Sequence, residues 1–210
     1  MKKILLISAL LSVLCSCGSG NGRVEKTLTG AHESYEWVDL GLPSGLKWAT
    51  CNVGASTPGE YGNYYAWGET VTRKKYSSDC CASYNKPWGD IGGNFGHDAA
   101  RANWGGSWRM PTKEEFQELV DNCTWEMTTQ DGNEGYMATG PNGQSIFLPA
   151  TGFRYEETLF VAGDGGGYWS STPFETRDDC SYGLYFHKVN MSIDYDGRYL
   201  GRSVRPVLAD

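Results

Sequence analysis

The sequence contains no run of basic residues. Its 210 residues include 18 Lys and Arg against 25 Asp and Glu, and the formal net charge is −7. Binding to nucleic acid depends on Lys and Arg side chains that neutralise phosphates. Binding to an anionic membrane surface through protein charge needs the same residues. The composition therefore predicts no nucleic-acid partner and no electrostatic attachment to a membrane.

The chain also lacks the short motifs of several enzyme and metal classes. It has no serine nucleophile elbow, no Walker loop and no HExxH sequence. It has no C-x₂-C pair, and its histidines (His32, His97 and His187) are scattered, which argues against a zinc site. The motifs alone indicate a protein that is not an enzyme.

Long amphipathic patterns are nearly absent, and Leu and Ile are modest. Gly (28), Tyr (13) and Trp (8) are abundant instead. This profile predicts short strands, many turns and a core in which aromatic side chains supply much of the buried area. Residues 35–210 have a normal length for one domain, and we see neither an internal repeat nor a second domain.

The N-terminus has the features of a secretion signal. Lys2 and Lys3 precede an apolar run over residues 4–14. That run is shorter than the roughly 20 residues that a membrane span needs, so it is typical of a cleaved signal peptide covering residues 1–16.

The signal ends in Leu14-Cys15-Ser16-Cys17, which resembles the lipobox of bacterial lipoproteins. Cys17 fits the lipidated position better than Cys15, because Cys15 follows the bulky Leu14. We therefore expect a protein anchored to the bilayer by acyl chains on Cys17. Cleavage removes two lysines and no acidic residue, so the net charge moves from −7 to about −9.

Residues 17–34 are mostly polar and rich in Gly, which predicts a flexible tether. No acidic cluster follows Cys17. In similar bacterial lipoproteins, an acidic cluster directly after the lipidated cysteine looks like a signal for display on the cell surface. The expected location is therefore the cell envelope, at the outer membrane, with the periplasmic and surface faces both open.

Five cysteines follow the tether, in an exported chain where disulfides can persist. Five is odd, so at least one thiol stays unpaired within the chain. Adjacent Cys80 and Cys81 seldom bond to each other. We favour a bridge from Cys51 to Cys123, and a second from Cys180 to Cys80 or Cys81, although sequence does not determine connectivity.

Several segments have clear local signals. Residues 35–40 and 47–53 predict a hairpin, and so do residues 134–139 and 144–148. Thr112 and Glu115 form a capping box ahead of an apolar stripe, which predicts a helix over residues 113–122. Residues 98–103 predict one or two helical turns, residues 64–67 form a third short apolar run, and residues 73–97 predict an irregular excursion.

Six stretches in order resemble a known family: VDLGLPSGLKWATCNVGA, YYAWGET, DAARANWGGSWRMPT, GYMATGPNGQSIFLPATGFR, YWSST and GRSVRPV. Together they cover nearly all of residues 38–207. They are similar to the Fibrobacter succinogenes major paralogous domain, whose members typically occur in exported bacterial lipoproteins and surface proteins.

A more distant resemblance concerns WRMPTKEEF, residues 108–116, which is similar to an element of formylglycine-generating, sulfatase-modifying domains. It implies an α+β fold of C-type-lectin-like architecture, with small twisted antiparallel sheets, one or two short helices and long irregular loops. Prominent motif residues are expected to be structural; they are Trp48, Trp108, Arg109, Pro111, Thr112, Trp169 and Arg205.

The same resemblance raises two chemical possibilities. Oxidase activity of the formylglycine-generating kind needs two reactive cysteines near the end of the fold, and this chain offers only Cys180 there. Lectin-like folds often bind Ca²⁺, for which the weak candidates here are Asp164, Asp194 and Asp196. Turn chemistry explains these aspartates as well, and the EPN and QPD triplets of sugar-binding lectins are missing.

These observations favour a lipid-anchored, non-enzymatic binding or adhesion module for a glycan, a peptide or a partner protein. Loops on a rigid scaffold usually carry recognition. We therefore expect contacts from residues 73–97 and 154–166, through Tyr84, Trp88, Phe95 and Phe160. The alternatives are a diverged envelope enzyme of the cysteine oxidase type and a structural subunit of a surface assembly.

Overall fold

The computed structural model describes residues 28–188 and 190–208. The expected signal peptide, Cys17 and most of the expected tether lie outside the described residues. The described chain is mainly β with two short helices, so the expected α+β class is confirmed. No helix in this part of the chain is long and apolar enough to cross a membrane.

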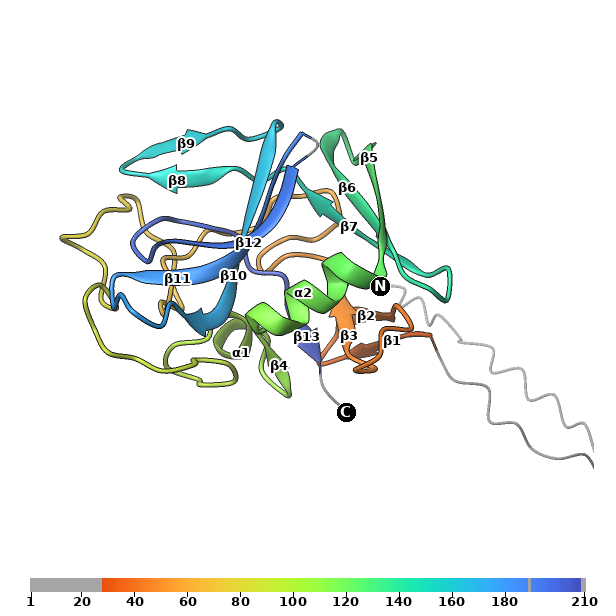
Figure 1. The fold of residues 1–210 in the computed structure, drawn as a ribbon, viewed down its shortest axis with the longest axis horizontal. Coiled ribbons are helices and arrows are strands. Elements are labelled where there is room, and N and C mark those ends of the chain that lie inside the picture. Colours follow the sequence, from red (N-terminus) through yellow and green to blue (C-terminus); the bar gives the residue numbers. More distant parts are fainter. Residues whose placement is uncertain (1–27, 189, 209–210) are drawn as a thin grey trace, which may run out of the picture.

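The strands form several small antiparallel sheets (Figure 1). The first is five-stranded, in the order β1-β2-β3-β13-β4, and joins both ends of the domain. Two three-stranded sheets have the orders β5-β6-β7 and β10-β11-β12, and β8-β9 is a separate hairpin. The elements are β1 (Thr29–His32), β2 (Tyr35–Asp39), β3 (Lys47–Ala49), α1 (Ala99–Trp104), β4 (Trp108–Arg109), α2 (Lys113–Asn122), β5 (Thr124–Gln130), β6 (Asn133–Thr139), β7 (Ser145–Pro149), β8 (Phe153–Tyr155), β9 (Thr158–Phe160), β10 (Gly165–Pro173), β11 (Cys180–His187), β12 (Asn190–Gly197) and β13 (Val207–Leu208).

The predicted hairpins and helices are confirmed. Strands β2 and β3 pair antiparallel, as do β6 and β7. Helix α2 begins and ends where the sequence predicts, and its capping box is complete. Helix α2 packs on the β10-β11-β12 sheet, with Phe116 and Leu119 buried in the larger core cluster.

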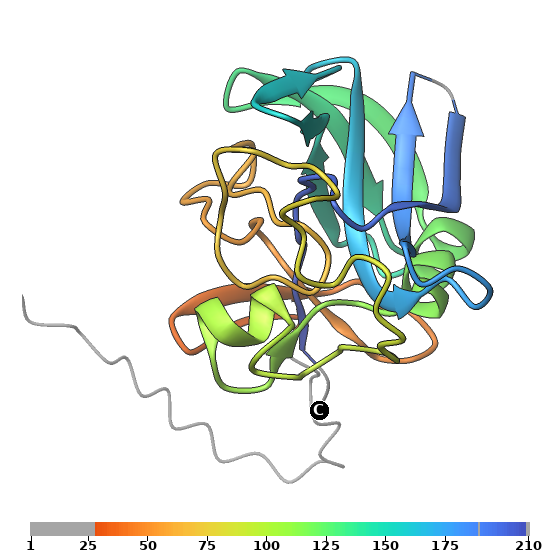
Figure 2. The ribbon, with the colours of Figure 1, turned by 90° about the vertical axis from the view of Figure 1, so that its left-hand side faces the viewer.

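The segment between β3 and α1 has no strand and covers one side of the molecule (orange to yellow-green in Figure 2). Single β-bridges attach it to the rest, between Tyr65 and Arg202 and between Tyr76 and Glu156. The irregular excursion predicted over residues 73–97 is confirmed. The apolar run at residues 64–67 is buried but does not join a sheet.

Two expected boundaries are wrong. The tether was expected to reach residue 34, but Thr29–His32 forms β1 and pairs with β2. The strand expected over residues 47–53 ends at Ala49, because the backbone then turns and Val53 bonds to Val204 instead. Strand β5 was not predicted. In β5 most residues are exposed, so the apolar alternation that marks a half-buried strand is missing.

Three buried arginines follow β12: Arg198, Arg202 and Arg205. The Arg198 guanidinium donates to the carbonyls of Ser83 and Lys86, and it therefore holds the irregular segment against β11. This short C-terminal stretch passes between the sheets, and each of its arginines ties a different segment to the core.

Candidate functional site

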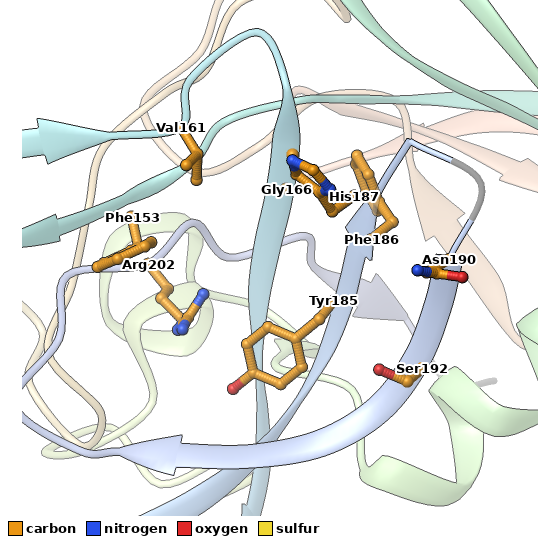
Figure 3. A pocket seen from close by; sticks show the side chains of 11 residues that line it. Phe153, Val161, Gly166, Tyr185, Phe186, His187, Asn190, Ser192 and Arg202 are labelled. Carbon is orange, nitrogen blue, oxygen red and sulfur yellow. The ribbon is translucent and has the colours of Figure 1, made fainter.

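A pocket of about 250 Å³ lies between the β8-β9 hairpin and the β10-β11-β12 sheet (Figure 3). One wall comes from Phe153 and Arg202, and the opposite rim from Asn190 and Ser192 on β12. Its surface is predominantly apolar. The complete lining is Gly152, Phe153, Val161, Gly165, Gly166, Tyr185, Phe186, His187, Asn190, Ser192 and Arg202.

Glycines at the start of β10 make room for the side chains of this pocket. A Cβ on Gly166 would lie 2.3 Å from the ring of Phe186, and a Cβ on Gly167 would lie 1.9 Å from Nη1 of Arg202. Both distances are too short for any side chain. The glycine-rich sequence before Tyr168 therefore lets Phe186 and Arg202 approach the sheet.

Arg202 is the cation of the pocket. Its side chain is buried, and its Nη2 donates to Oδ2 of Asp196 at 2.5 Å. The guanidinium carbon lies 4.4 Å from the ring centre of Tyr185 and 5.2 Å from that of Phe153. Aromatic faces attract a guanidinium at such distances, so the rings and Asp196 together fix its position.

Two buried polar atoms beside the pocket have no hydrogen-bond partner among the described residues. They are Nε of Arg202 and the hydroxyl oxygen of Tyr185. Burial raises the pKa of Tyr185, so its hydroxyl stays protonated at neutral pH. A buried donor without a partner costs free energy, and a ligand or a water that supplies an acceptor here would recover part of that cost.

The rim differs from the base. His187, Asn190 and Ser192 are exposed to solvent, and they offer donors and acceptors around the mouth. Val161 is also exposed and completes the apolar side. A few polar groups around an apolar hollow are typical of small-ligand sites.

A second hollow, of about 510 Å³, lies between the irregular segment and β8. Arg73, Lys74 and Arg154 give it a positive lining, with Glu157 as the acidic member. The Arg73 guanidinium is occupied by the buried Glu69, to which it gives two hydrogen bonds. This hollow is wider and more polar than the first.

The motif residues expected to be structural lie in or against the core. Trp48, Trp108 and Trp169 are fully buried. Arg109 pairs with Glu115, which also accepts from the Thr112 amide beside the buried Pro111. Arg205 donates to Asn52 and to the carbonyls of Ala49, Thr50 and Phe147.

Among the described residues, the four aromatic side chains expected to form a contact surface make no ring contact with one another. Phe95 is 70% exposed. Trp88 instead packs on His97, with ring centres 4.0 Å apart. Tyr84 contacts Tyr199, and Phe160 stacks on Phe153 at 5.5 Å, next to the pocket.

The expected disulfides are not formed, and all five described cysteines are free. Cys51 lies in a surface hollow beside Thr50, whereas Cys123 caps the C-terminus of α2 against the larger core cluster. Cys80 contacts Ser77 in a turn, Cys81 packs near Tyr64, and Cys180 is buried at the start of β11. No bond joins any two of these thiols, so the pairing predicted from the sequence was wrong.

The weak calcium candidates are not gathered into a site. Asp196 is paired with Arg202, and Asp194 lies two residues before it on β12. Asp164 lies in the turn before β10. Across residues 28–188 and 190–208, no group of three or more His, Cys, Asp or Glu side chains is placed to hold a metal ion.

Arg202, Tyr185 and Phe153 were missed as site residues. One sequence feature could have pointed to this site. The glycine triplet Gly165–Gly167 leaves space beside its strand, and other side chains must fill that space. Which side chain fills it depends on how the C-terminal stretch crosses β10. That crossing brings together residues far apart in the sequence.

Comparison with known proteins gives one result. The sequence model of the family described as the Lcl C-terminal domain matches residues 41–208. No curated protein and no solved structure matches the chain. The matched region includes every residue that lines the pocket.

Proposed function

We propose that this chain, which belongs to the Lcl C-terminal domain family, is a non-enzymatic binding or adhesion module of the bacterial cell envelope. Its ligand is a glycan, a peptide or a partner protein. The family match is consistent with a bacterial surface protein.

The pocket beneath the β8-β9 hairpin is the observation that carries this proposal. It joins an apolar base, a buried arginine and an exposed polar rim in one hollow of about 250 Å³. Such hollows with few convergent polar groups are the usual form of a small-ligand site. Backbone pairing fixes the glycines and Arg202 in place, so the surrounding strands define the shape of the pocket.

The narrower family resemblance and the detailed architecture of the fold are also part of the proposal. The order of the sequence motifs supports the resemblance to the Fibrobacter succinogenes major paralogous domain. Short sheets, two helices and long irregular segments suit a C-type-lectin-like architecture. In that architecture recognition falls to loops and hairpins, which agrees with the place of the pocket.

The attachment to the envelope rests on the sequence alone. The Leu14-Cys15-Ser16-Cys17 segment supports acylation of Cys17 at the outer membrane. The chain from Cys17 to the first strand at Thr29 is short. A domain anchored in this way stays near the bilayer, where it binds ligands that approach the membrane.

An enzymatic role as a cysteine oxidase has less support. Burial and the neighbouring Asp179 carboxylate raise the pKa of Cys180 to about 11. A thiol with such a pKa is almost entirely protonated at neutral pH, whereas a reactive cysteine acts as a thiolate. Assembly into a surface structure as a subunit has no specific observation in its favour.

The test is a screen of the labelled full-length protein, in detergent, against arrays of glycans and peptides. Ser192→Trp places a large ring at the exposed rim of the pocket, and Thr129→Trp places the same ring on the exposed strand β5. We expect at least one ligand whose binding falls about tenfold or more with Ser192→Trp and is unchanged with Thr129→Trp. If every ligand binds both variants as well as it binds the original protein, the pocket is not the binding site.

A further inference from the structure

We propose that the pocket binds the acetamido group of an uncharged N-acetylated sugar. The inference rests on the proposed binding function and names the ligand class of that same pocket. It follows from the size of the hollow, the donors at its wall, the nearby negative charge and the polar rim.

The apolar base fits a small apolar group. Phe153, Val161 and Phe186 line the apolar part together with glycine backbone, and the volume of about 250 Å³ limits the occupant to about one sugar ring with its acetamido group. The methyl of an acetamido group buries apolar area there. The aromatic faces also suit the C–H edge of a sugar ring.

The wall of the pocket calls for a hydrogen-bond acceptor. A guanidinium has five N–H donors, and the hydrogen bond shown for Arg202 uses only Nη2, toward Asp196. Nε of Arg202 and the Tyr185 hydroxyl are buried without partners among the described residues. An amide carbonyl offers two lone pairs and no charge, so it can accept from this wall beside a methyl group.

The charge around Arg202 selects a neutral acceptor over a carboxylate. Asp196 already neutralises the guanidinium, and Asp194 acts on the neighbouring Tyr185 as a second negative charge. A carboxylate ligand would enter beside these like charges, which disfavours it. An acetamido oxygen accepts the same hydrogen bonds without that repulsion.

The exposed rim suits hydroxyl groups. Asn190 and Ser192 project from β12 on one side of the mouth, and His187 lies at the end of β11 (Figure 3). Together they provide both donors and acceptors, which match the mixed donor and acceptor character of sugar hydroxyls. A purely apolar ligand would leave this rim unused.

Equilibrium dialysis of the full-length protein against N-acetylglucosamine and N-acetylgalactosamine tests the inference. Glucosamine, glucose and N-acetylneuraminic acid are the comparison sugars. We expect one of the two N-acetylated sugars to bind with a Kd on the order of 1 mM. Glucose and glucosamine should bind at least tenfold more weakly, and the anionic N-acetylneuraminic acid should bind more weakly as well.

The rim variants locate the binding. Ser192→Trp should weaken the N-acetylated sugar at least tenfold, while Thr129→Trp should leave it unchanged. Glucose binding as tightly as its N-acetylated form would overturn the inference, and so would preference for the anionic sugar. If array ligands depend on Ser192 but no N-acetylated sugar binds, the ligand class is wrong and the binding function stands. If no ligand depends on Ser192, both fail.

Discussion

Arg205 is a charged side chain in a fully buried site, and its hydrogen bonds go to neutral groups. Its guanidinium donates to Oδ1 of Asn52 and to three backbone carbonyls from β3, its following turn and β7. Burial lowers the pKa of Arg205, yet an arginine remains protonated in proteins. The side chain therefore works as a multiple donor that joins two sheets through their backbones.

Replacing Arg205 should destabilise the fold strongly. Arg205→Met keeps much of the volume but leaves the carbonyl groups without their donor, so we expect a loss of about 3 kcal/mol in the free energy of unfolding. Urea unfolding measures it. Arg177→Met is the control, since Arg177 is 53% exposed and pairs with Asp179 at the surface. A loss no larger than that of the control would show that the buried hydrogen bonds contribute little.

Cys180 predicts how stability depends on pH. Its ordinary thiol pKa of 9.0 is raised to about 11 in the folded protein, first by burial and then by Asp179. The folded state therefore keeps its proton where the unfolded state loses it, and stability should fall as pH rises from about 9 through 11. Below pH 9 this contribution is fully present.

Comparison of the protein with Cys180→Ala between pH 8 and pH 11 isolates this thiol. Both should lose stability in alkali, since Cys123 also has a pKa raised to about 11. The variant should lose less, by on the order of 2 kcal/mol. Equal losses in urea unfolding would mean that Cys180 ionises as easily folded as unfolded.

At the residue scale, the sequence predicted which side chains are buried better than it predicted which residues contact one another. The motif tryptophans lie in the core because large aromatic side chains bury the most area. The cysteine pairs were wrong since pairing depends on distances across the fold. Arg202 was missed for the same reason: its place depends on which strand the C-terminal stretch crosses.

Helix α2 is the element that the sequence determines most fully. The Thr112 hydroxyl accepts from the Glu115 amide at 3.2 Å, and a Glu115 carboxylate oxygen accepts from the Thr112 amide at 2.8 Å. Glu115 also receives two hydrogen bonds from Arg109 on β4. The cap thus fixes both the start of the helix and its angle to the five-stranded sheet.

Removal of the cap should cost a moderate amount of stability. Thr112→Ala loses the acceptor for the Glu115 amide, and we expect the free energy of unfolding to fall by about 1 kcal/mol. Thr112→Ser retains the hydroxyl and should stay close to the original protein in the same urea experiment. If the serine variant loses as much as the alanine variant, the methyl group and not the cap is responsible.

The strands were less predictable than the helices because their pairing is non-local. The β2-β3 and β6-β7 hairpins have turn signals between adjacent strands, and both were predicted. Strand β13 pairs with β3 and β4, which lie far away in the sequence. No local pattern indicates such a neighbour, and the exposed residues of β5 offer no alternation either.

At the scale of the whole molecule, the proposed anchor makes its own prediction. Cys17→Ser should abolish incorporation of labelled fatty acid and release the protein from the membrane fraction, because several acyl chains supply the anchoring free energy. Cys15→Ser is the matched control, and it should leave labelling unchanged. Labelling that depends on Cys15, or on neither cysteine, would contradict the assignment.

The pocket itself depends on the whole fold. Its walls come from β8, β10, β11, β12, the turn before β10 and the C-terminal stretch. The sequence indicated loops at residues 73–97 and 154–166 as contact segments, and the second range contains most of the β8-β9 hairpin, which borders the pocket. It could not indicate that Arg202, distant in sequence from Phe153, would lie over its ring.

A structure of the protein with the strongest ligand of the array screen tests the central claim most directly. We predict the ligand in the pocket beneath the β8-β9 hairpin, with an acceptor atom within hydrogen-bond distance of Arg202 and with contacts to Phe153 and Ser192. A ligand seated in the hollow of Arg73, Lys74 and Arg154, with the pocket unoccupied, would contradict the account.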